Sequence, residues 1–364
     1  MLRHVAQLGG VGTYTRSLVA HLLRHDRDND YVLLYSDPAL VGSRADPPRV
    51  IEEAVPARSS LLWDQWTVPA LARKHRLDLV FNPKLSVPLL ARCRKIFVMH
   101  GGEWFVFPEN YSPAFRLYHR VFGPLYCRFA DSFVAATHAA ADDIARALGI
   151  DRRKIRAIHH GVDPRFCGAA DAAESRRLRQ AHGLPERYVL WVGQIYPMKN
   201  VGGLIRAFRR VRERFDCGLV LAGKPHLKAE RDLALIESCG LERDVVRLGW
   251  VPDEDLPALY RQAAVFAFPS LYEGFGIPIV EAMACGCPVV TSNRGAPAEV
   301  AGDAALLVDP GDDASIADGI CRVLGDGGLR EDLVARGRRR AAAFTWEACA
   351  AETLALFREV AAGR

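Results

Sequence analysis

Two glutamates, Glu273 and Glu281, stand eight residues apart across a glycine-rich turn. Gly274 and Gly276 let the backbone of this turn approach a ligand closely. A carboxylate accepts hydrogen bonds from vicinal hydroxyls such as those of a ribose, and a loop carboxylate beside exposed amides can hold a sugar hydroxyl next to a diphosphate. The pair therefore indicates a nucleotide-sugar ligand. The alternative is a glutamate that caps a helix and a second that is a solvated charge on it.

The segments around this turn must position both carboxylates. The apolar run 265–268 predicts a strand that ends before the turn, and Pro278 suits the first position of a helix. We therefore expect Glu281 in the first helical turn and Glu273 in the loop before it.

Residues 273–290 also carry a family pattern. They read Glu-Gly-Phe-Gly-x-Pro-x-x-Glu followed by Ala-Met-Ala-Cys-Gly-Cys-Pro-Val-Val. This closely resembles the donor-site signature of glycosyltransferase family 4, the group 1 retaining glycosyltransferases, and is far more specific than a lone glycine motif. The resemblance implies a catalytic role for Glu273 and donor contacts from Glu273, Gly274, Phe275, Gly276 and Glu281.

A second diagnostic stretch, residues 190–201, reads as a strand, a turn and the start of a helix, and it contains Gly193 and Lys199. A lysine at a helix start opposes the helix dipole unless an anion lies nearby. In the family, a lysine here faces the donor diphosphate and stabilises the charge that builds as the glycosidic bond breaks. The resemblance thus makes Gly193 and Lys199 donor-binding and Lys199 catalytic. A solvent-exposed lysine is the alternative.

One residue departs from the family pattern. Many relatives carry an arginine directly after the glycine that corresponds to Gly193, whereas this chain has Gln194. We expect diphosphate binding to depend more heavily on Lys199 as a result.

The N-terminal half offers two further elements. The run Gly9 to Tyr14 precedes an amphipathic pattern, so the amides near Gly10 and Gly12 could meet a phosphate or an acceptor hydroxyl. His100 ends a strand and is followed by glycines. The resemblance implies that His100 is catalytic, donating to a hydroxyl of the reacting sugar or contributing to the oxocarbenium environment. We expect Glu103 to orient a loop, and His138, His159 and His160 to be structural.

Short β-branched runs alternate with helical patterns, which predicts parallel sheets with crossover helices in an α/β fold. The resemblance implies the GT-B architecture of two facing, doubly wound Rossmann-like domains. We expect an acceptor-side domain at 1–165, a donor-binding domain at 166–344 and a C-terminal helix at 345–364 that returns to the first domain. The expected strands are 31–35, 79–81, 96–99, 133–136, 188–192, 219–222, 245–248, 265–268, 289–291 and 305–308.

The start of the chain departs from the family. Relatives begin with an apolar strand before the glycine-rich turn, but residues 1–8 contain no continuous β-run. We expect the first strand of the N-terminal sheet to be missing and the true start to lie upstream.

Composition is typical of a globular protein, with 50% hydrophobic and 25% charged residues and a net charge of +5. No apolar run approaches the ~18 residues of a spanning helix, and no signal peptide opens the chain. We therefore expect a cytoplasmic protein.

The clustered arginines are expected to lie on solvated helix faces, with a peripheral contact to anionic membrane lipid as the alternative. We expect no nucleic-acid partner, because no basic stripe is interleaved with aromatic residues. The nine scattered cysteines are expected to be reduced.

The resemblance implies a retaining hexosyltransferase that needs no metal or other cofactor, since Lys199 and backbone dipoles replace a metal. Mannose is the favoured sugar and GDP-mannose the favoured donor, with a UDP-sugar left open and base contacts expected around Val251. The acceptor would be a glycan or lipid-linked hydroxyl in cell-surface polysaccharide or lipopolysaccharide synthesis. Two other classes stay open: a non-catalytic nucleotide-sugar-binding subunit, favoured by Gln194, and a GT-B nucleotide-sugar epimerase.

Overall fold

The computed structural model describes residues 2, 9–42, 49–56, 59–84, 86–169 and 171–363. The chain forms two compact units, the first made of Met1–Gly161 with Trp346–Arg364 and the second of Val162–Thr345. The boundary between the two units thus lies a few residues before the boundary expected from the sequence, at residue 165. The last helix, α16 (Trp346–Ala361), belongs to the first unit although it follows the second in the sequence.

The first unit holds a four-stranded parallel sheet in the order β3-β4-β5-β6 and a separate parallel pair, β1 and β2. Its strands are β1 (Tyr31–Tyr35), β2 (Val50–Ala54), β3 (Leu79–Asn82), β4 (Arg94–Met99), β5 (Ser132–Ala135) and β6 (Ile155–Ala157). Its helices besides α16 are α1 (Gly10–His25), α2 (Ser60–Leu62), α3 (Val68–Lys74), α4 (Glu103–Val106), α5 (Pro113–Phe129) and α6 (His138–Leu148), with a π-helical turn at Trp63–Thr67.

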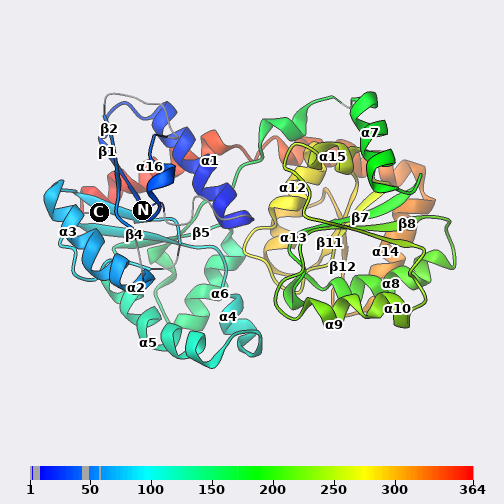
Figure 1. Ribbon diagram of the computed structural model, residues 1–364, viewed down its shortest axis with the longest axis horizontal. Helices are drawn as coiled ribbons and strands as arrows, with labels where there is room; N and C mark the ends of the chain where they lie inside the picture. Colours follow the sequence, from blue (N-terminus) through cyan, green and yellow to red (C-terminus); the bar gives the residue numbers. More distant parts are fainter. Residues whose placement is uncertain are drawn as a thin grey trace. The chain divides into compact units, whose positions relative to one another are not determined.

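Both faces of the four-stranded sheet are covered, because alternate residues of a strand point to opposite faces. Ile96 and Val98 of β4 pack in one core with α1 and α16. Phe97 and Met99 of the same strand pack in another core with α5 and α6. Figure 1 shows α1 and α16 together, away from α5 and α6. This double burial explains why β4 reads as a continuous apolar run.

The expectation of a missing first strand falls mainly outside the described residues. Of the first eight positions, the structure describes Leu2, whose side chain is buried beside Leu33 and Tyr35. The Leu2 amide donates to the Leu34 carbonyl at 2.7 Å.

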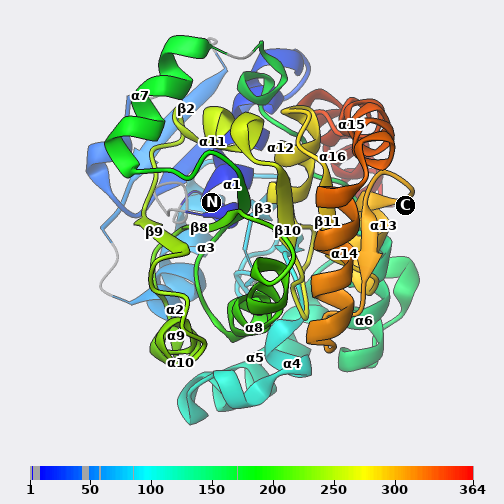
Figure 2. The same ribbon diagram turned by 90° about the vertical axis from the view of Figure 1, so that its right-hand side faces the viewer.

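The second unit contains one six-stranded parallel sheet in the order β12-β11-β10-β7-β8-β9. Helices α8 and α14 pack together on one face, and α11, α12 and α15 lie on the other (Figures 1 and 2). The strands are β7 (Tyr188–Val192), β8 (Gly218–Ala222), β9 (Val245–Gly249), β10 (Val265–Phe268), β11 (Val289–Ser292) and β12 (Leu306–Val308). The helices are α7 (Ala172–His182), α8 (Val201–Arg212), α9 (Ala229–Leu233), α10 (Leu235–Ser238), α11 (Leu256–Gln262), α12 (Ile277–Ala284), α13 (Gly295–Ala301), α14 (Asp313–Gly325) and α15 (Gly327–Ala341).

All the strands expected from the sequence are present, with ends that differ by at most two residues. Strands β2 and β6 were not expected. The two glutamates Glu52 and Glu53 break the apolar pattern of β2, and β6 has only three residues, one of them Arg156. Both are paired on one side in the described residues, where a strand tolerates more polar side chains.

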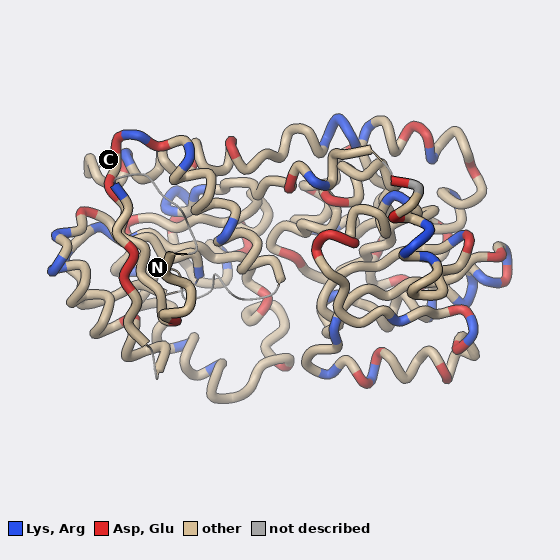
Figure 3. Tube along the Cα trace, turned by 45° about the horizontal axis from the view of Figure 1, so that its top comes forward, with Lys and Arg blue, Asp and Glu red and all other residues tan. Residues whose placement is uncertain are grey.

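No described helix combines the length and apolar character needed to cross a bilayer. Basic and acidic residues are interspersed over both units in Figure 3. The Arg152–Lys154 cluster illustrates this, because Arg152 pairs with Asp142 and Arg153 with Asp151.

Candidate functional site

The loops that follow β7 and β10 meet at the carboxyl end of the second sheet. The Leu271 amide donates to the Met198 carbonyl at 2.8 Å, which joins the two loops. Beside this bond, the Lys199 ammonium donates to the Glu273 carboxylate, with Nζ and Oε1 2.6 Å apart. Strands β7 and β10 are neighbours in the sheet, so their carboxyl ends bring together two residues that are 74 positions apart in the sequence.

The Lys199–Glu273 pair is largely withdrawn from solvent, with 13% and 9% of the two side chains exposed. The Lys199 ammonium also lies 5.0 Å from the centre of the Phe268 ring, an arrangement that attracts a cation. Lys199 ends a 3₁₀ turn, Pro197–Lys199, and Asn200 is the N-cap residue before helix α8, which begins at Val201. The lysine therefore stands at a helix start, as the sequence predicts.

Asn200 fixes the backbone next to Lys199. It has a φ of 54°, in the left-handed region that asparagine tolerates better than most residues. Its side-chain amide donates to the carbonyls of Pro269 at 3.0 Å and Pro310 at 2.7 Å, which follow β10 and β12. The sequence analysis assigned no role to Asn200. The feature that could have indicated one is an asparagine at a sharp turn directly before a helix.

Glu281 lies on α12, in the second helical turn. The expectation of a first-turn position is wrong, because α12 begins at Ile277 and Pro278 is its second residue. The Tyr260 hydroxyl donates to Glu281 Oε2 at 2.9 Å from the buried face of α11. Among the described residues, Oε1 of Glu281 makes no hydrogen bond.

Burial raises the pKa of the Glu281 carboxyl to about 7, and the Tyr260 hydrogen bond opposes this rise. The carboxylates of Asp253 and Asp163 raise the pKa further, while the Arg165 guanidinium lowers it. Glu281 thus sits among several charges and is poised to change protonation near neutral pH. Asp253 follows Val251 by two positions, so the loop after β9 lies within electrostatic range of Glu281.

Val251 itself is buried, with 6% of its surface exposed. Phe275 is also buried, at 3%, and its ring meets Phe344 edge to face at 5.6 Å. The Phe275 side chain therefore belongs to the core of the unit. A ligand could contact this residue through its backbone. Gly276 has a φ of 93°, which favours glycine, and a Cβ there would stand 2.9 Å from Ile279 Cδ1.

Gly193 follows β7 and faces Gly223, which follows β8. A Cβ added to Gly223 would lie 1.6 Å from the Gly193 carbonyl oxygen, so only glycine fits. The Gly193 amide donates to Ala222 at 3.0 Å, which extends the pairing of the two strands. Gln194, next along the chain, is exposed.

In the first unit, His100 follows β4, and its Nε2 is 2.7 Å from the Pro83 carbonyl. Because a carbonyl only accepts, Nε2 carries the proton. Burial lowers the pKa of His100 to about 4, so the ring is neutral at pH 7 and Nδ1 has a free lone pair. In this tautomer Nδ1 is an acceptor, and the catalytic role of His100 stays a prediction.

Tyr14 connects His100 to helix α1. Its ring lies 4.9 Å from the His100 ring and 4.6 Å from that of His160. His160 is 4% exposed, in keeping with a structural role. Gly10 and Gly12 were expected to precede α1, but the helix begins at Gly10 and Gly12 is its third residue. Their amides therefore belong to the first turn of α1, where a helix has unsatisfied donors.

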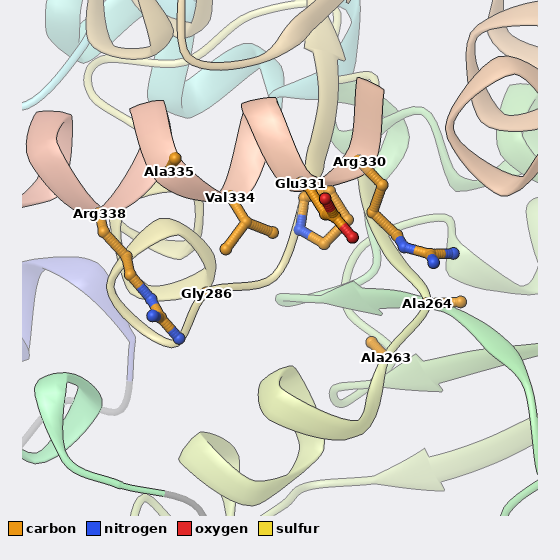
Figure 4. A pocket seen from close by; sticks show the side chains of 9 residues that line it. Ala263, Ala264, Gly286, Arg330, Glu331, Val334, Ala335 and Arg338 are labelled. Carbon is orange, nitrogen blue, oxygen red and sulfur yellow. The ribbon is translucent and has the colours of Figure 1, made fainter. Parts of the chain in front are cut away.

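The described residues contain no cluster of three or more His, Cys, Asp or Glu side chains that could hold a metal ion. A pocket of about 420 Å³ lies at the opposite end of the second sheet, where Ala263 and Ala264 precede β10 and Pro288 precedes β11 (Figure 4). Arg330, Glu331 and Arg338 of α15 also line it. It contains none of the predicted site residues.

Comparison with known proteins divides the chain into two family matches. Residues 8–166 match the model described as glycosyltransferase family 4, and residues 174–340 match that described as glycosyl transferases group 1. The O-antigen chain mannosyltransferase B of Escherichia coli is 43% identical over 169 residues, which cover 46% of this chain and 44% of the relative. The D-inositol 3-phosphate glycosyltransferase of Salinispora arenicola is 36% identical over 249 residues, 64% of this chain and 56% of the relative. These alignments thus span about half the length of the two relatives.

Solved structures share the fold across nearly the whole chain. HepE of Anabaena, in complex with UDP and glucose, superposes with a TM-score of 0.75 at 21% identity, covering 96% of each chain. A glycosyltransferase of Rickettsia africae superposes with a TM-score of 0.75 at 18% identity, covering 98% of this chain and 96% of that one. Both sheets and their helices follow the GT-B architecture, and the chain belongs to the group 1 glycosyltransferases, with a family 4 domain as its first half.

Proposed function

We propose that this chain transfers a hexose from a nucleoside-diphosphate sugar to a hydroxyl acceptor, with retention of configuration at the anomeric carbon. The observation that carries the proposal is the meeting of Lys199 with Glu273 at the carboxyl end of the second sheet, with Glu281 on the helix that follows. A cation beside a carboxylate at this edge suits a ligand with both a diphosphate and a sugar.

Lys199 would bind the donor diphosphate. Its present partner is the Glu273 carboxylate, so donor binding requires the ammonium to exchange that anion for a phosphate oxygen or to share both. Glu273 would then be free to accept a hydrogen bond from a sugar hydroxyl. Glu281 would accept from the ribose through Oε1, while Tyr260 holds Oε2.

During transfer, the bond between the anomeric carbon and the diphosphate oxygen breaks and a bond to the acceptor oxygen forms on the same face. The acceptor proton goes to an oxygen of the departing diphosphate. The charge on that diphosphate grows as the bond breaks, so Lys199 stabilises the transition state more than the ground state. We propose that this cation, together with backbone dipoles, makes the reaction independent of a metal.

Mannose is the proposed sugar and GDP-mannose the proposed donor. The support is the 43% identity to a relative named as an O-antigen chain mannosyltransferase. A UDP-sugar is the second candidate, since HepE shares the fold and was crystallised with UDP-glucose. By the same reasoning the acceptor is a glycan or lipid-linked hydroxyl in cell-surface polysaccharide synthesis.

A thermal-shift screen of nucleotides and nucleotide-sugars tests the donor. A ligand at about 100 times its dissociation constant stabilises a protein by roughly 2.7 kcal/mol. We expect guanosine diphosphate and GDP-mannose to give the largest shift, and a larger shift with UDP-glucose would replace the proposed donor.

Product analysis separates transfer from the other classes. Purified protein, GDP-mannose and a lipid extract should give a product heavier by one hexose, with the configuration of the donor retained. Gln194 favours the alternative of a non-catalytic subunit, which would bind donor and form no product. An epimerase would convert the nucleotide-sugar without any acceptor.

A further inference from the structure

The loop that follows strand β3 supplies the hydrogen-bond partner of His100. Strands β3 and β4 are parallel neighbours in which Asn82 pairs with Phe97, so the loops that follow them lie at the same edge of the first sheet. His100 comes directly after β4, and its Nε2 donates to the carbonyl of Pro83, directly after β3, at 2.7 Å. The position of this carbonyl therefore depends on the loop after β3.

The packing of the His100 ring does not by itself select the position of its proton. The Tyr14 ring meets the His100 ring edge to face at 4.9 Å, and the His160 ring lies 5.7 Å away. Such contacts restrict the plane of an imidazole, but either nitrogen can still carry the proton. The hydrogen bond that one nitrogen makes decides which of them does. With the proton on Nδ1, the Pro83 carbonyl would lose this donor, which disfavours that tautomer by about 5- to 150-fold.

The Asn82 side chain joins the described residues of the loop after β3. Its Oδ1 accepts from the Lys84 amide at 3.2 Å. Its Nδ2 donates to the carbonyl oxygen of Ser86 at 2.8 Å and to the hydroxyl oxygen of the same residue at 2.7 Å. Asn82 is 2% exposed, so water does not compete for these bonds. Because the bonds connect Asn82 to residues on the other side of Pro83, they fix the direction of the Pro83 carbonyl.

The π-helical turn of the first unit holds the same loop from a second direction. Asp64 of this turn is 2% exposed and accepts from Ser86 Oγ at 2.7 Å. Gln65, the next residue, donates to the Val87 carbonyl at 2.9 Å and accepts from the Leu89 amide at 2.8 Å. Turns of this kind are rare and occur frequently at functional sites. Buried polar side chains from two elements therefore hold the loop after β3.

We propose that Asn82 is a positioning residue for His100. Its carboxamide fixes the loop after β3 so that the Pro83 carbonyl holds the His100 proton on Nε2, which presents Nδ1 as an acceptor to a substrate hydroxyl. Apolar side chains would fill the same space without the cost of removing polar groups from water, whereas a hydrogen-bonded network fixes one geometry. The effect on catalysis rests on the proposed transfer, but the tautomer of His100 does not.

Nitrogen-15 NMR of the whole chain, labelled at histidine, measures the tautomer without any substrate. At neutral pH we expect the unmodified chain to carry the His100 proton on Nε2, and His100→Gln identifies the His100 signals by their loss. Asn82→Ala should shift His100 toward a mixture of both tautomers. The same proton position in Asn82→Ala and in the unmodified chain would overturn the proposal, and so would a proton on Nδ1 in the unmodified chain.

Ser86→Ala replaces Asn82→Ala as the test if the latter fails to fold. It removes the hydroxyl that links Asn82 to Asp64 but keeps the bond from Asn82 to the Ser86 carbonyl, so we expect a smaller shift in the same direction. Ser132→Ala is the matched control, because Ser132 is also buried and its hydroxyl donates to the Lys154 carbonyl at the opposite edge of the sheet. Equal tautomer populations in the two serine variants would then refute the role of the loop.

Transfer rates test whether Asn82 acts through His100. Asn82→Ala should lower kcat by about 3- to 10-fold, because it weakens one hydrogen bond to the substrate. The KM for GDP-mannose should hardly change, since the proposed donor contacts lie in the second unit. His100→Gln should lose at least as much, and adding Asn82→Ala to it should cost nothing further. Losses that multiply in the double variant would show that Asn82 does not act through His100.

The two readouts separate this inference from the proposed function. The expected tautomers in a chain that transfers no hexose would support the positioning of His100 and refute the transfer. Transfer by a chain whose His100 tautomer does not respond to Asn82 would do the reverse.

Discussion

Glu281 and Glu273 have different surroundings, and this difference predicts different phenotypes. Glu281→Ala should weaken nucleotide affinity by about 10- to 150-fold, because losing a charged hydrogen-bonding partner costs roughly 1.5–3 kcal/mol. Glu273→Ala should leave nucleotide affinity nearly unchanged and depress turnover. Calorimetry with the nucleotide, alongside initial rates, measures both.

Glu331→Ala is the matched control for these variants, since Glu331 lies beside the pocket at the other end of the sheet. If both site variants match this control in affinity and rate, the two carboxylates do not contact the donor.

Lys199 should matter for rate more than for folding. Lys199→Ala should reduce turnover by orders of magnitude, because the charge it meets grows in the transition state. Lys154→Ala, at an exposed position of the first unit, is the control. Activity should also survive a chelator, and loss of activity in EDTA that a divalent ion restores would contradict the metal-free proposal.

The raised pKa of Glu281, about 7, predicts a pH-dependent stability. Between its ordinary pKa and about 7, the folded protein holds a proton on Glu281 that the unfolded chain releases. The stabilising contribution is therefore complete below the ordinary pKa and is lost as the pH rises through about 7. Glu281→Gln should gain stability relative to the unmodified chain between pH 5 and pH 8, by up to about 3 kcal/mol.

Chemical denaturation of the unmodified chain and of Glu281→Gln, at pH 5 and at pH 8, measures the difference in their free energies of unfolding. The same difference at both pH values would mean that Glu281 titrates normally. The same raised pKa predicts that nucleotide affinity increases with pH through neutrality, because ribose hydroxyls donate to the ionised carboxylate.

At the scale of elements, the loops after β7 and β8 leave no room for a side chain at Gly223. A Cβ there would stand 1.6 Å from the Gly193 carbonyl oxygen, so Gly223→Ala must force the ends of the two strands apart. We expect a loss of about 2–4 kcal/mol in the free energy of unfolding and weaker nucleotide binding.

Gly327→Ala is the control, since a Cβ at Gly327 meets nothing within 4 Å and its φ is not positive. Urea denaturation compares the two. Similar stabilities would show that the strand ends adjust freely.

At the scale of the whole molecule, the last helix completes the core of the first unit. It contributes the buried residues Trp346, Cys349, Ala350, Leu354, Leu356 and Val360. Burying each large apolar side chain contributes about 1.5–3 kcal/mol, against a net stability of only ~5–15 kcal/mol. Removal of 346–364 should therefore unfold the first unit and leave the second folded.

Limited proteolysis with mass spectrometry distinguishes the units, with removal of 362–364 as the control because residues 362 and 363 are exposed. Equal resistance of the first unit in both truncated chains would show that α16 is dispensable.

The sequence by itself determined the fold class, most of the strands and the family. Buried parallel strands are apolar on both faces, so runs such as 188–192 are visible without any structure. The glycine-rich segment 273–281 is equally local, because its turn, carboxylates and helix start are consecutive. The polar strand β2 and the short strand β6 were not predicted, because neither contains a continuous apolar run.

Only the tertiary structure decided which residues meet. Lys199 pairs with Glu273, and Tyr260 with Glu281, because strand order and helix packing bring distant segments together, which no local pattern reports. The tertiary structure also buries the Phe275 side chain against Phe344, and it places the Pro83 carbonyl where it accepts the proton of His100 Nε2. Burial and hydrogen-bond partners are set by the folded environment, and these decide the charge that each site residue carries.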